Sequence, residues 1–311
     1  MRALTIENGR PVVVEATLPV ARRGEVLVDV QYSAINDMDV QVRDGGWRRQ
    51  VRDYRRRGPT LTGIELGGVA RTDGARIRAG QRVIGYSHVL SGPRAHAEVV
   101  AMAERDLQVI PDGLGIDRAV ALLVGGLAAI DVLERLRPLR AGERCLVAGA
   151  AGGVGAAAVQ IARHQGAEVH AVAARAHAGW LQTLGVIDVR DPTQDSWWRP
   201  GDAFDLVIDG PGKSTFGQAA ARLAPGGTYV STNPQRDLLG FAQAALSSKR
   251  AGWLLLLRSN PAGLKRLLDL AAADVLQPVV DSVYSLDNAA AGFERVTMRG
   301  KRGRVMMTIS S

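Results

Sequence analysis

The stretch RCLVAGAAGGVGAAAVQIARHQG, residues 144–166, indicates the fold of this chain. A short apolar run at 145–148 ends at a glycine-rich turn, and apolar residues then recur at helical spacing. We therefore expect a strand, a tight turn and a helix, followed by a second strand at 168–173 that completes a βαβ unit. The turn is a variant of the G-x-G-x-x-G pattern in which Ala151 stands at the second glycine.

Small residues in this turn allow the backbone to approach a pyrophosphate, and the free N–H groups at the start of the helix favour its negative charge. We therefore predict that the turn binds a dinucleotide. The alternative is a glycine loop that serves packing alone. The predicted cofactor-binding residues of the turn are Ala150, Ala151, Gly152, Gly153, Val154 and Gly155.

Length and composition favour a globular protein of two domains. The chain has 311 residues, of which 46% are hydrophobic, and its apolar runs are too short to span a bilayer. The N-terminus alternates like a strand and lacks the apolar core of a signal peptide, so we expect a cytoplasmic protein without a membrane segment. The only cysteine, Cys145, lies in the predicted buried strand, where a role in the core is expected.

The net charge of +8 comes mainly from arginine, and the densest cluster lies in a predicted exposed loop at 44–60. The cluster is not accompanied by a nucleic-acid-binding motif, so binding to DNA or RNA is not expected. A small anionic or carrier-bound substrate is the alternative that we favour. The cluster consists of Arg48, Arg49, Arg52, Arg55, Arg56 and Arg57.

Strand signals with glycine-rich turns dominate the first part of the chain and predict a small β-rich barrel. After the glycine-rich turn at 149–155, predicted strands and helices alternate as far as residue 231. Such alternation is typical of a parallel, doubly wound sheet. The fold class is therefore α/β.

Five motifs, in this order, resemble the medium-chain dehydrogenase/reductase superfamily. They are GIELGG at 63–68, AGQRVIG at 79–85, AGAAGGVG at 148–155, LAPGGTYV at 223–230 and LQPVVDSVYSLDNAAAGFE at 276–294. The AAGGVG form is similar to the zinc-independent quinone oxidoreductase branch, which includes the enoyl reductases of polyketide assembly. The resemblance implies a GroES-like catalytic domain formed by residues 1–117 and 258–311, with a Rossmann domain at 118–257 inserted between them.

The resemblance also identifies the three positions at which zinc-dependent relatives bind the catalytic metal. Zinc-dependent relatives place Cys, His and Cys or Asp at the positions that read Asn36, Ile64 and Val124 here. Two of these three side chains cannot bind zinc, so no metal is expected. Without a Lewis acid, hydride chemistry favours an activated acceptor, and the resemblance implies a reductase of quinones or α,β-unsaturated carbonyl compounds.

The end of the second predicted strand discriminates between the two nicotinamide cofactors. An acid there would bind the ribose 2′-hydroxyl, whereas an arginine suits a 2′-phosphate. Because this segment carries Arg175 and no acid, we predict NADPH, with Arg175 as the phosphate ligand. The alternative is an ordinary surface arginine.

In relatives, the positions of Asn36 and of the Thr232-Asn233 turn lie beside the nicotinamide. Asn36 is the predicted polar group of the catalytic site, with a helix cap as its alternative. Tyr54 is the candidate proton donor, although Trp47 stands at the usual tyrosine position and Tyr54 could be an ordinary loop residue.

Two rival functions remain open because several habitual contacts of the nicotinamide are substituted in this chain. One rival is a redox-neutral enzyme such as a cyclase of secondary metabolism, and the other is a nucleotide-binding protein with vestigial catalysis. The resemblance also implies a homodimer formed through the sheet edge of the Rossmann domain, near the apolar run at 253–257.

Overall fold

The computed structural model describes residues 1–46, 61–87, 94–194, 196–233, 237–254 and 261–310. The chain divides into two compact units. Unit 1 comprises Met1–Val124 and Leu256–Ser311, and unit 2 comprises Gly125–Leu255, whereas the sequence analysis placed the division at 118 and 257. The chain passes from unit 1 to unit 2 within helix α2 (Ile116–Ile130).

The first half of α2 belongs to unit 1 because it packs closely on strand β4 (Glu65–Ala70). A Cβ atom at Gly67 of β4 would lie 2.3 Å from Val120 Cγ2 and 2.7 Å from Ile116 Cγ2. The absence of a side chain at Gly67 therefore makes room for this face of the helix. This contact joins residues far apart in the sequence, so the pattern of the helix alone could not reveal it.

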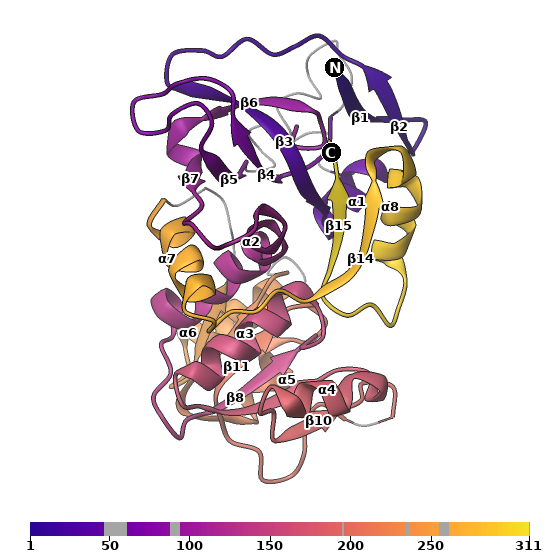
Figure 1. Cartoon of the computed structure of the whole chain (residues 1–311). Coiled ribbons are helices and arrows are strands. Elements are labelled where there is room, and N and C mark those ends of the chain that lie inside the picture. Colours follow the sequence, from indigo (N-terminus) through magenta and orange to yellow (C-terminus); the bar gives the residue numbers. More distant parts are fainter. Residues whose placement is uncertain (47–60, 88–93, 195, 234–236, 255–260, 311) are drawn as a thin grey trace. The chain divides into compact units, whose positions relative to one another are not determined.

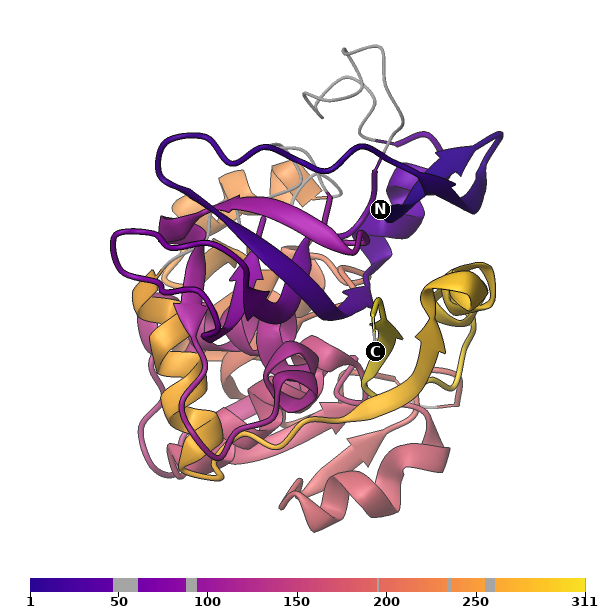
Figure 2. The same cartoon turned by 45° about the horizontal axis from the view of Figure 1, so that its top comes forward.

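Unit 1 is built around the long strand β3 (Glu25–Ile35), which alternates buried and half-buried residues. Val26, Val28 and Val30 are fully buried, as the period of a strand with one face on a core requires. β3 pairs antiparallel with β4, with β6 (Val99–Ala103) and with β15 (Arg304–Thr308). Because β15 comes from the C-terminal segment, both ends of the chain build the same GroES-like domain (Figure 2).

The main sheet of unit 1 has the strand order β14-β15-β3-β4-β5-β7, and a separate hairpin precedes it. The hairpin turns at Asn8 and Gly9, whose positive φ angles of 50° and 75° suit a two-residue Asn-Gly turn. The remaining strands and helices of unit 1 are β1 (Arg2–Glu7), β2 (Arg10–Glu15), α1 (Asp37–Arg43), β5 (Arg82–Tyr86), β7 (Leu107–Val109), α7 (Pro261–Ala272), β14 (Val280–Ser285) and α8 (Ala289–Thr297).

Helix α8 packs against β14 and β15 (Figure 2), and a partly buried ion pair ties it to β14. Asp281 of β14 accepts bonds of 2.7 Å from Arg295 Nε and Nη2, and a third of 2.8 Å from the Arg302 N–H. The bonds from Arg295 are the main reason that the pKa of Asp281 is lowered to about 2. This pair stabilises the C-terminal part of unit 1.

Unit 2, in which Figure 1 labels β8, β10 and β11, contains a six-stranded parallel sheet with the order β10-β9-β8-β11-β12-β13. The order reverses between β8 and β11, which makes this a doubly wound Rossmann-type sheet, as the sequence predicts. Its elements are β8 (Arg144–Ala148), α3 (Gly153–His164), β9 (Glu168–Val172), α4 (Ala178–Thr183), β10 (Asp188–Arg190), β11 (Phe204–Asp209), α5 (Phe216–Ala220), β12 (Leu223–Ser231), α6 (Leu238–Ala245) and β13 (Arg250–Trp253).

Cys145 lies in the central strand β8 and is fully buried. Burial raises the pKa of its thiol far above the ordinary value, so the reactive thiolate is disfavoured. The expected role of Cys145 in the core is confirmed.

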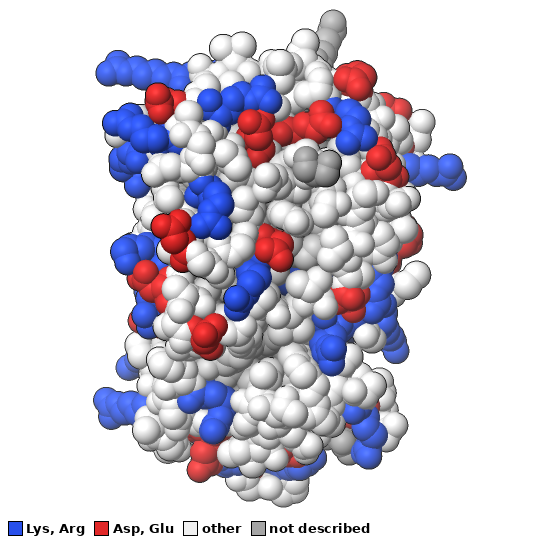
Figure 3. Space-filling view, in the orientation of Figure 1, with Lys and Arg blue, Asp and Glu red and all other residues white. Residues whose placement is uncertain are grey.

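Charged side chains of both signs are interspersed over the face drawn in Figure 3. The excess of arginine therefore does not form a continuous basic surface on that face. Within the part of the chain that the structure describes, no helix is both long and apolar enough to cross a membrane.

Candidate functional site

The glycine-rich turn between β8 and α3 is a backbone cradle with no space for larger residues. A Cβ atom at Gly155 would lie 2.2 Å from the Gly149 carbonyl oxygen and 2.6 Å from Ala150 Cα. Gly149 itself has a φ of +70°, which an L side chain rarely adopts. The Gly149 N–H donates to the Val172 carbonyl at 2.9 Å, so the turn is also tied to the end of β9.

The start of α3 has the features of an anion site. Gly152 is the N-cap residue, Gly153 and Val154 begin the helix, and their backbone N–H groups lie in its first turn. Ala150 and Ala151 are buried, whereas Gly152, Gly153 and Val154 at the start of the helix are half-buried. This geometry fits the pyrophosphate of a dinucleotide.

The loop that follows β11 supports the glycine-rich turn from the neighbouring strand. Pro211 in this loop packs on Gly149, because a Cβ atom at Gly149 would lie 2.8 Å from Pro211 Cγ. Thr232, which follows β12, donates its hydroxyl to the Gly210 carbonyl at 2.8 Å. Three loops at the carboxyl ends of adjacent parallel strands therefore contact one another, where open α/β sheets bind their ligands.

The sequence analysis missed Asp209, which holds the loop after β11 in place. Asp209 is fully buried, and its Oδ2 accepts from the Ser214 N–H at 2.7 Å and from the Tyr229 hydroxyl at 3.0 Å. Burial raises the pKa of Tyr229, which therefore stays a neutral donor. The sequence does contain a pattern that could have indicated this role, because Asp209 ends an apolar strand and directly precedes Gly-Pro-Gly.

Arg175 directly follows the segment at the end of β9, and its side chain is exposed. The Arg175 backbone N–H donates at 2.8 Å to Oδ2 of the buried Asp191, whose Oδ1 accepts from the Thr193 N–H and hydroxyl. The bonds from Thr193 are the main reason that the pKa of Asp191 is lowered. Both oxygens of this nearby acid are thus used by the protein, while the Arg175 guanidinium remains exposed.

Asn233 is exposed beside Thr232, and its backbone N–H donates to the Ser231 hydroxyl at 3.2 Å. Thr232, Asn233, Arg175 and the glycine-rich turn all belong to unit 2 and follow the carboxyl ends of its strands. The structure brings these predicted residues to one edge of one sheet. Their contact with a cofactor stays a prediction.

Asn36 lies in unit 1, in a buried polar centre that also contains Glu65 and Arg304. Asn36 Nδ2 donates to Glu65 Oε1 at 2.8 Å, and Asn36 Oδ1 accepts from Arg304 Nη1 at 2.9 Å. Arg304 Nη2 donates to Glu65 Oε1 as well, and the Val124 N–H donates to Glu65 Oε2 at 3.1 Å. Burial raises the pKa of Glu65, and the positive charge of Arg304 opposes that rise.

The backbone around Asn36 forms the start of α1, so the alternative role at a helix terminus also applies. Asn36 occupies the N-cap position, and its backbone N–H donates to Asp39 Oδ2 at 2.8 Å. Asp39 Oδ1 accepts from the Gly63 N–H at 2.8 Å. The side chain of Asn36, by contrast, is directed to the polar centre.

A buried histidine supports the same region. The ring of His96 contacts the Thr62 hydroxyl through Nδ1 at 2.8 Å and the Ala34 carbonyl through Nε2 at 3.1 Å. Burial lowers the pKa of His96, which favours the neutral ring. A carbonyl can only accept, so Nε2 carries the proton and Nδ1 accepts from Thr62.

The side chains at the superfamily's zinc positions do not fit the metal. Ile64 is aliphatic, Val124 contributes a backbone N–H to Glu65, and the oxygen of Asn36 is bound to Arg304. The Arg304 guanidinium also places a positive charge where a divalent cation would have to bind. Among the described residues, no group of three His, Cys, Asp or Glu side chains could hold a metal ion.

Several residues of the sequence analysis lie outside the described residues. They are Tyr54, Trp47 and the arginine cluster at 48–57. Their proposed roles stay predictions.

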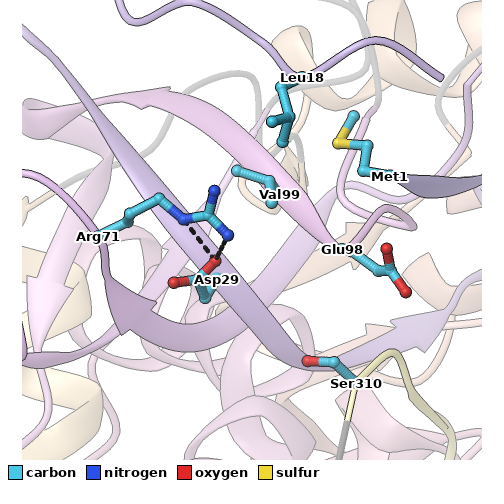
Figure 4. Close-up of a pocket in the computed structure, with 7 residues that line it drawn as sticks. All are labelled: Met1, Leu18, Asp29, Arg71, Glu98, Val99 and Ser310. Carbon is cyan, nitrogen blue, oxygen red and sulfur yellow. Dashed lines mark hydrogen bonds and ion pairs between the residues drawn. The ribbon is translucent and has the colours of Figure 1, made fainter.

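A surface groove of about 430 Å³ lies elsewhere in unit 1 (Figure 4). Arg71 and Asp29 pair across it, with Arg71 Nε donating to Asp29 Oδ1 at 2.8 Å. Glu98, which also lines the groove, accepts from Arg2. Because these charged side chains already pair within the protein, they offer a ligand few further ionic interactions.

Two family models match the chain. The model described as the alcohol dehydrogenase GroES-like domain matches residues 22–134, and the model described as zinc-binding dehydrogenase matches residues 184–306. Together they cover parts of both structural units.

Curated relatives match nearly the whole chain. The pikromycin polyketide synthase component PikAII of Streptomyces venezuelae is 28% identical over 308 residues, which cover 93% of this chain and 8% of that protein. The chloroplastic quinone-oxidoreductase homolog of Spinacia oleracea is 25% identical over 311 residues, which cover 94% of this chain and 92% of that protein. The chain spans only 5 to 14% of the polyketide synthase proteins PikAII, NorB, EryA2 and GfsB that it matches.

Solved structures share the whole fold. The quinone oxidoreductase from Coxiella burnetii superposes with a TM-score of 0.91 at 23% identity, covering 100% of this chain and 99% of that one. Mycobacterial Rv1454c, solved in complex with NADPH, has a TM-score of 0.82 at 25% identity, with 99% of each chain covered.

Proposed function

Since the chain belongs to the medium-chain dehydrogenase/reductase superfamily, whose quinone oxidoreductase- and enoyl reductase-like members are its relatives, we propose a zinc-independent, NADPH-dependent reductase. Its acceptor is a quinone or an α,β-unsaturated carbonyl compound. The observation that carries this proposal is the backbone cradle at Gly149–Gly155, in which added side-chain atoms would collide with the backbone. The NADPH complex of a structural neighbour supports the choice of a nicotinamide cofactor.

The chain's own residues would bind the cofactor, orient the acceptor and polarise the acceptor's oxygen. When bound, NADPH would supply a hydride to the acceptor carbon. The N–H groups at the start of α3 and the exposed Arg175 hold the phosphates, and Thr232 and Asn233 line the same sheet edge. The electron pair displaced onto the acceptor oxygen is met by a backbone N–H or by the Asn36 amide, and a proton from water or from Tyr54 completes the reduction.

The test begins with calorimetric titration of the purified chain with NADPH and with NADH. NADPH oxidation by 1,4-benzoquinone is then followed. Binding of NADPH with turnover supports the reductase. Substrate turnover without NADPH consumption would identify the redox-neutral cyclase, and the absence of binding to either nucleotide would contradict the proposal.

Arg175→Ala tests the preference between the two cofactors. The loss of a guanidinium from a 2′-phosphate should weaken NADPH binding by about 10- to 100-fold, the usual value of a charge-assisted hydrogen bond. Binding of NADH, which lacks this phosphate, should be unchanged. Arg140→Ala is the matched control, because Arg140 is exposed near the amino end of β8. Equal losses for NADPH and NADH would exclude Arg175 as the phosphate ligand.

We also propose that a second copy of the chain pairs through the β13 edge of unit 2. β13 is the last strand of the sheet, and α6 beside it carries exposed apolar side chains. Leu239 is 80% exposed and Leu246, just after α6, is 92% exposed. Isolated apolar residues are common on surfaces, but a group of them beside the strand that ends the sheet, among the described residues, suits an interface.

Leu239→Glu should convert the dimer into a monomer, because the interface would have to bury an unpaired charge. Size-exclusion chromatography with light scattering measures the mass. Ile187→Glu is the control, since Ile187 is 55% exposed next to β10, the opposite edge strand of the sheet. A monomeric wild type, or a Leu239→Glu variant that stays dimeric, would rule out this interface.

A further inference from the structure

The side-chain amide of Asn36 has a determined orientation, because its two neighbours have opposite hydrogen-bonding capacities. Arg304 can only donate, so the atom 2.9 Å from its Nη1 must be the Asn36 oxygen. The Glu65 carboxylate accepts, so the atom 2.8 Å from its Oε1 must be the Asn36 nitrogen. Exchange of the amide oxygen and nitrogen would break both bonds.

Glu65 itself is held from several sides. The Val124 N–H donates to Oε2, Arg304 donates to Oε1, and the Ser33 hydroxyl donates to the Glu65 backbone carbonyl at 2.6 Å. Arg304 and the Val124 amide are donors under all conditions, so their convergence on the two oxygens favours the ionised carboxylate. Glu65 is therefore a fixed acceptor for the Asn36 amide.

One hydrogen of the Asn36 amide is only weakly engaged. Nδ2 lies 3.3 Å from the Ala34 carbonyl oxygen, at the long end of hydrogen-bond distances. That carbonyl also accepts from His96 Nε2. This hydrogen can therefore be shared with another oxygen at little cost, whereas the bonds to Glu65 and Arg304 are short.

We propose that Glu65 and Arg304 are positioning residues of the reductase: they hold Asn36 so that an amide hydrogen, and not the amide oxygen, is available to the acceptor's oxygen. This inference rests on the proposed function. Neither residue need touch the acceptor. Their role is to fix which end of the Asn36 amide donates.

Glu65→Gln tests this role while preserving the shape of the side chain. A glutamine presents either an oxygen or an NH₂ group to Asn36, so Glu65 no longer specifies the orientation of the Asn36 amide and Arg304 alone holds it. We expect kcat to fall by about 10- to 100-fold, as displaced catalytic donors usually cause. The dissociation constant of NADPH should change by less than about twofold, because the predicted cofactor residues of the cradle lie in unit 2.

Asp281→Asn is the matched control, since it also neutralises a partly buried carboxylate of unit 1 that is paired with an arginine. It should lower thermal stability without changing kcat. Arg304→Lys is the second variant. It keeps the positive charge, but a lysine cannot bond Asn36 and Glu65 with the fixed geometry of the guanidinium, so kcat should also fall. If both Glu65→Gln and Arg304→Lys lose activity only to the extent that Asp281→Asn does, the positioning role is excluded.

Nitrogen-15 resonances of the asparagine side chains give a readout that does not depend on turnover. The Asn36 signals are identified by their loss in Asn36→Ala, and slow hydrogen exchange is expected in the wild type. Glu65→Gln should shift them and speed their exchange, whereas Asp281→Asn should not. Unchanged Asn36 signals in Glu65→Gln would overturn the inference. A wild type that binds NADPH but reduces no acceptor would contradict the proposed function, and the resonances would still decide the orientation of Asn36.

Discussion

Replacement of Gly155 by alanine is expected to abolish NADPH binding to a chain that still folds. The added Cβ atom would lie 2.2 Å from the Gly149 carbonyl oxygen and 2.6 Å from Ala150 Cα, well inside contact distance. Both are backbone atoms of the turn itself, so no side chain can move aside to relieve the collision. The turn must shift, and the N–H groups that approach the pyrophosphate shift with it.

We expect the dissociation constant for NADPH to rise by at least about 100-fold, which corresponds to a loss of about 2.7 kcal/mol. Calorimetric titration measures this loss, and circular dichroism verifies that the sheet of unit 2 is retained.

Two other glycines serve as graded controls. A Cβ atom at Gly152 would lie 3.3 Å from the Gly149 oxygen, a tight contact that a small movement relieves, so Gly152→Ala should weaken binding far less. A Cβ atom at Gly179 would meet no atom within 4 Å, and Gly179→Ala should have no effect. Wild-type affinity in the Gly155→Ala variant would mean that the turn is not the cofactor cradle.

The cradle was predictable from the sequence because all of its determinants are local. Strand, turn and helix follow one another within residues 144–166, and the pattern of small residues is visible without any tertiary contact. The Asn8-Gly9 hairpin was predictable for the same reason.

The polar centre of unit 1 was only partly predictable. Asn36 was identified through the resemblance, but its partners Glu65 and Arg304 were not, because Arg304 is 239 residues away from Glu65 in the sequence. They meet because β3 pairs with β4 on one side and with β15 on the other. This register is a property of the whole sheet and leaves no local pattern. The support of the cradle by Asp209 was missed for a similar reason, since its partner Tyr229 lies on a neighbouring strand.

Arg304→Met is expected to be the most destabilising single substitution in unit 1. The Glu65 side chain is fully buried, and Arg304 is the positively charged group bonded to it. Removal of one partner of a buried ion pair leaves the other charge uncompensated, which typically costs about 3–5 kcal/mol. Urea unfolding at neutral pH should show this loss. Arg43→Met is the matched control: the carboxylates that pair with Arg43 are themselves largely exposed, so a loss of no more than about 1 kcal/mol is expected.

The pH dependence of this loss separates an uncompensated charge from a mere loss of packing. Without Arg304, the largest influence that opposes the effect of burial on Glu65 is lost, so the folded-state pKa of Glu65 rises further above the ordinary value of 4.5. A carboxyl group with a raised folded-state pKa stabilises the fold while it is protonated and loses this contribution as the pH rises through that pKa. The free energy of unfolding of Arg304→Met should therefore be closest to that of the wild type near pH 4.5, and the difference should grow as the pH increases. The double variant Glu65→Gln/Arg304→Met buries no charge, so it should recover most of the lost stability at neutral pH. The loss of stability in Arg304→Met could instead be the same at all pH values and persist when Glu65→Gln is added. That result would show that Arg304 contributes by packing and that Glu65 is not ionised in the native protein.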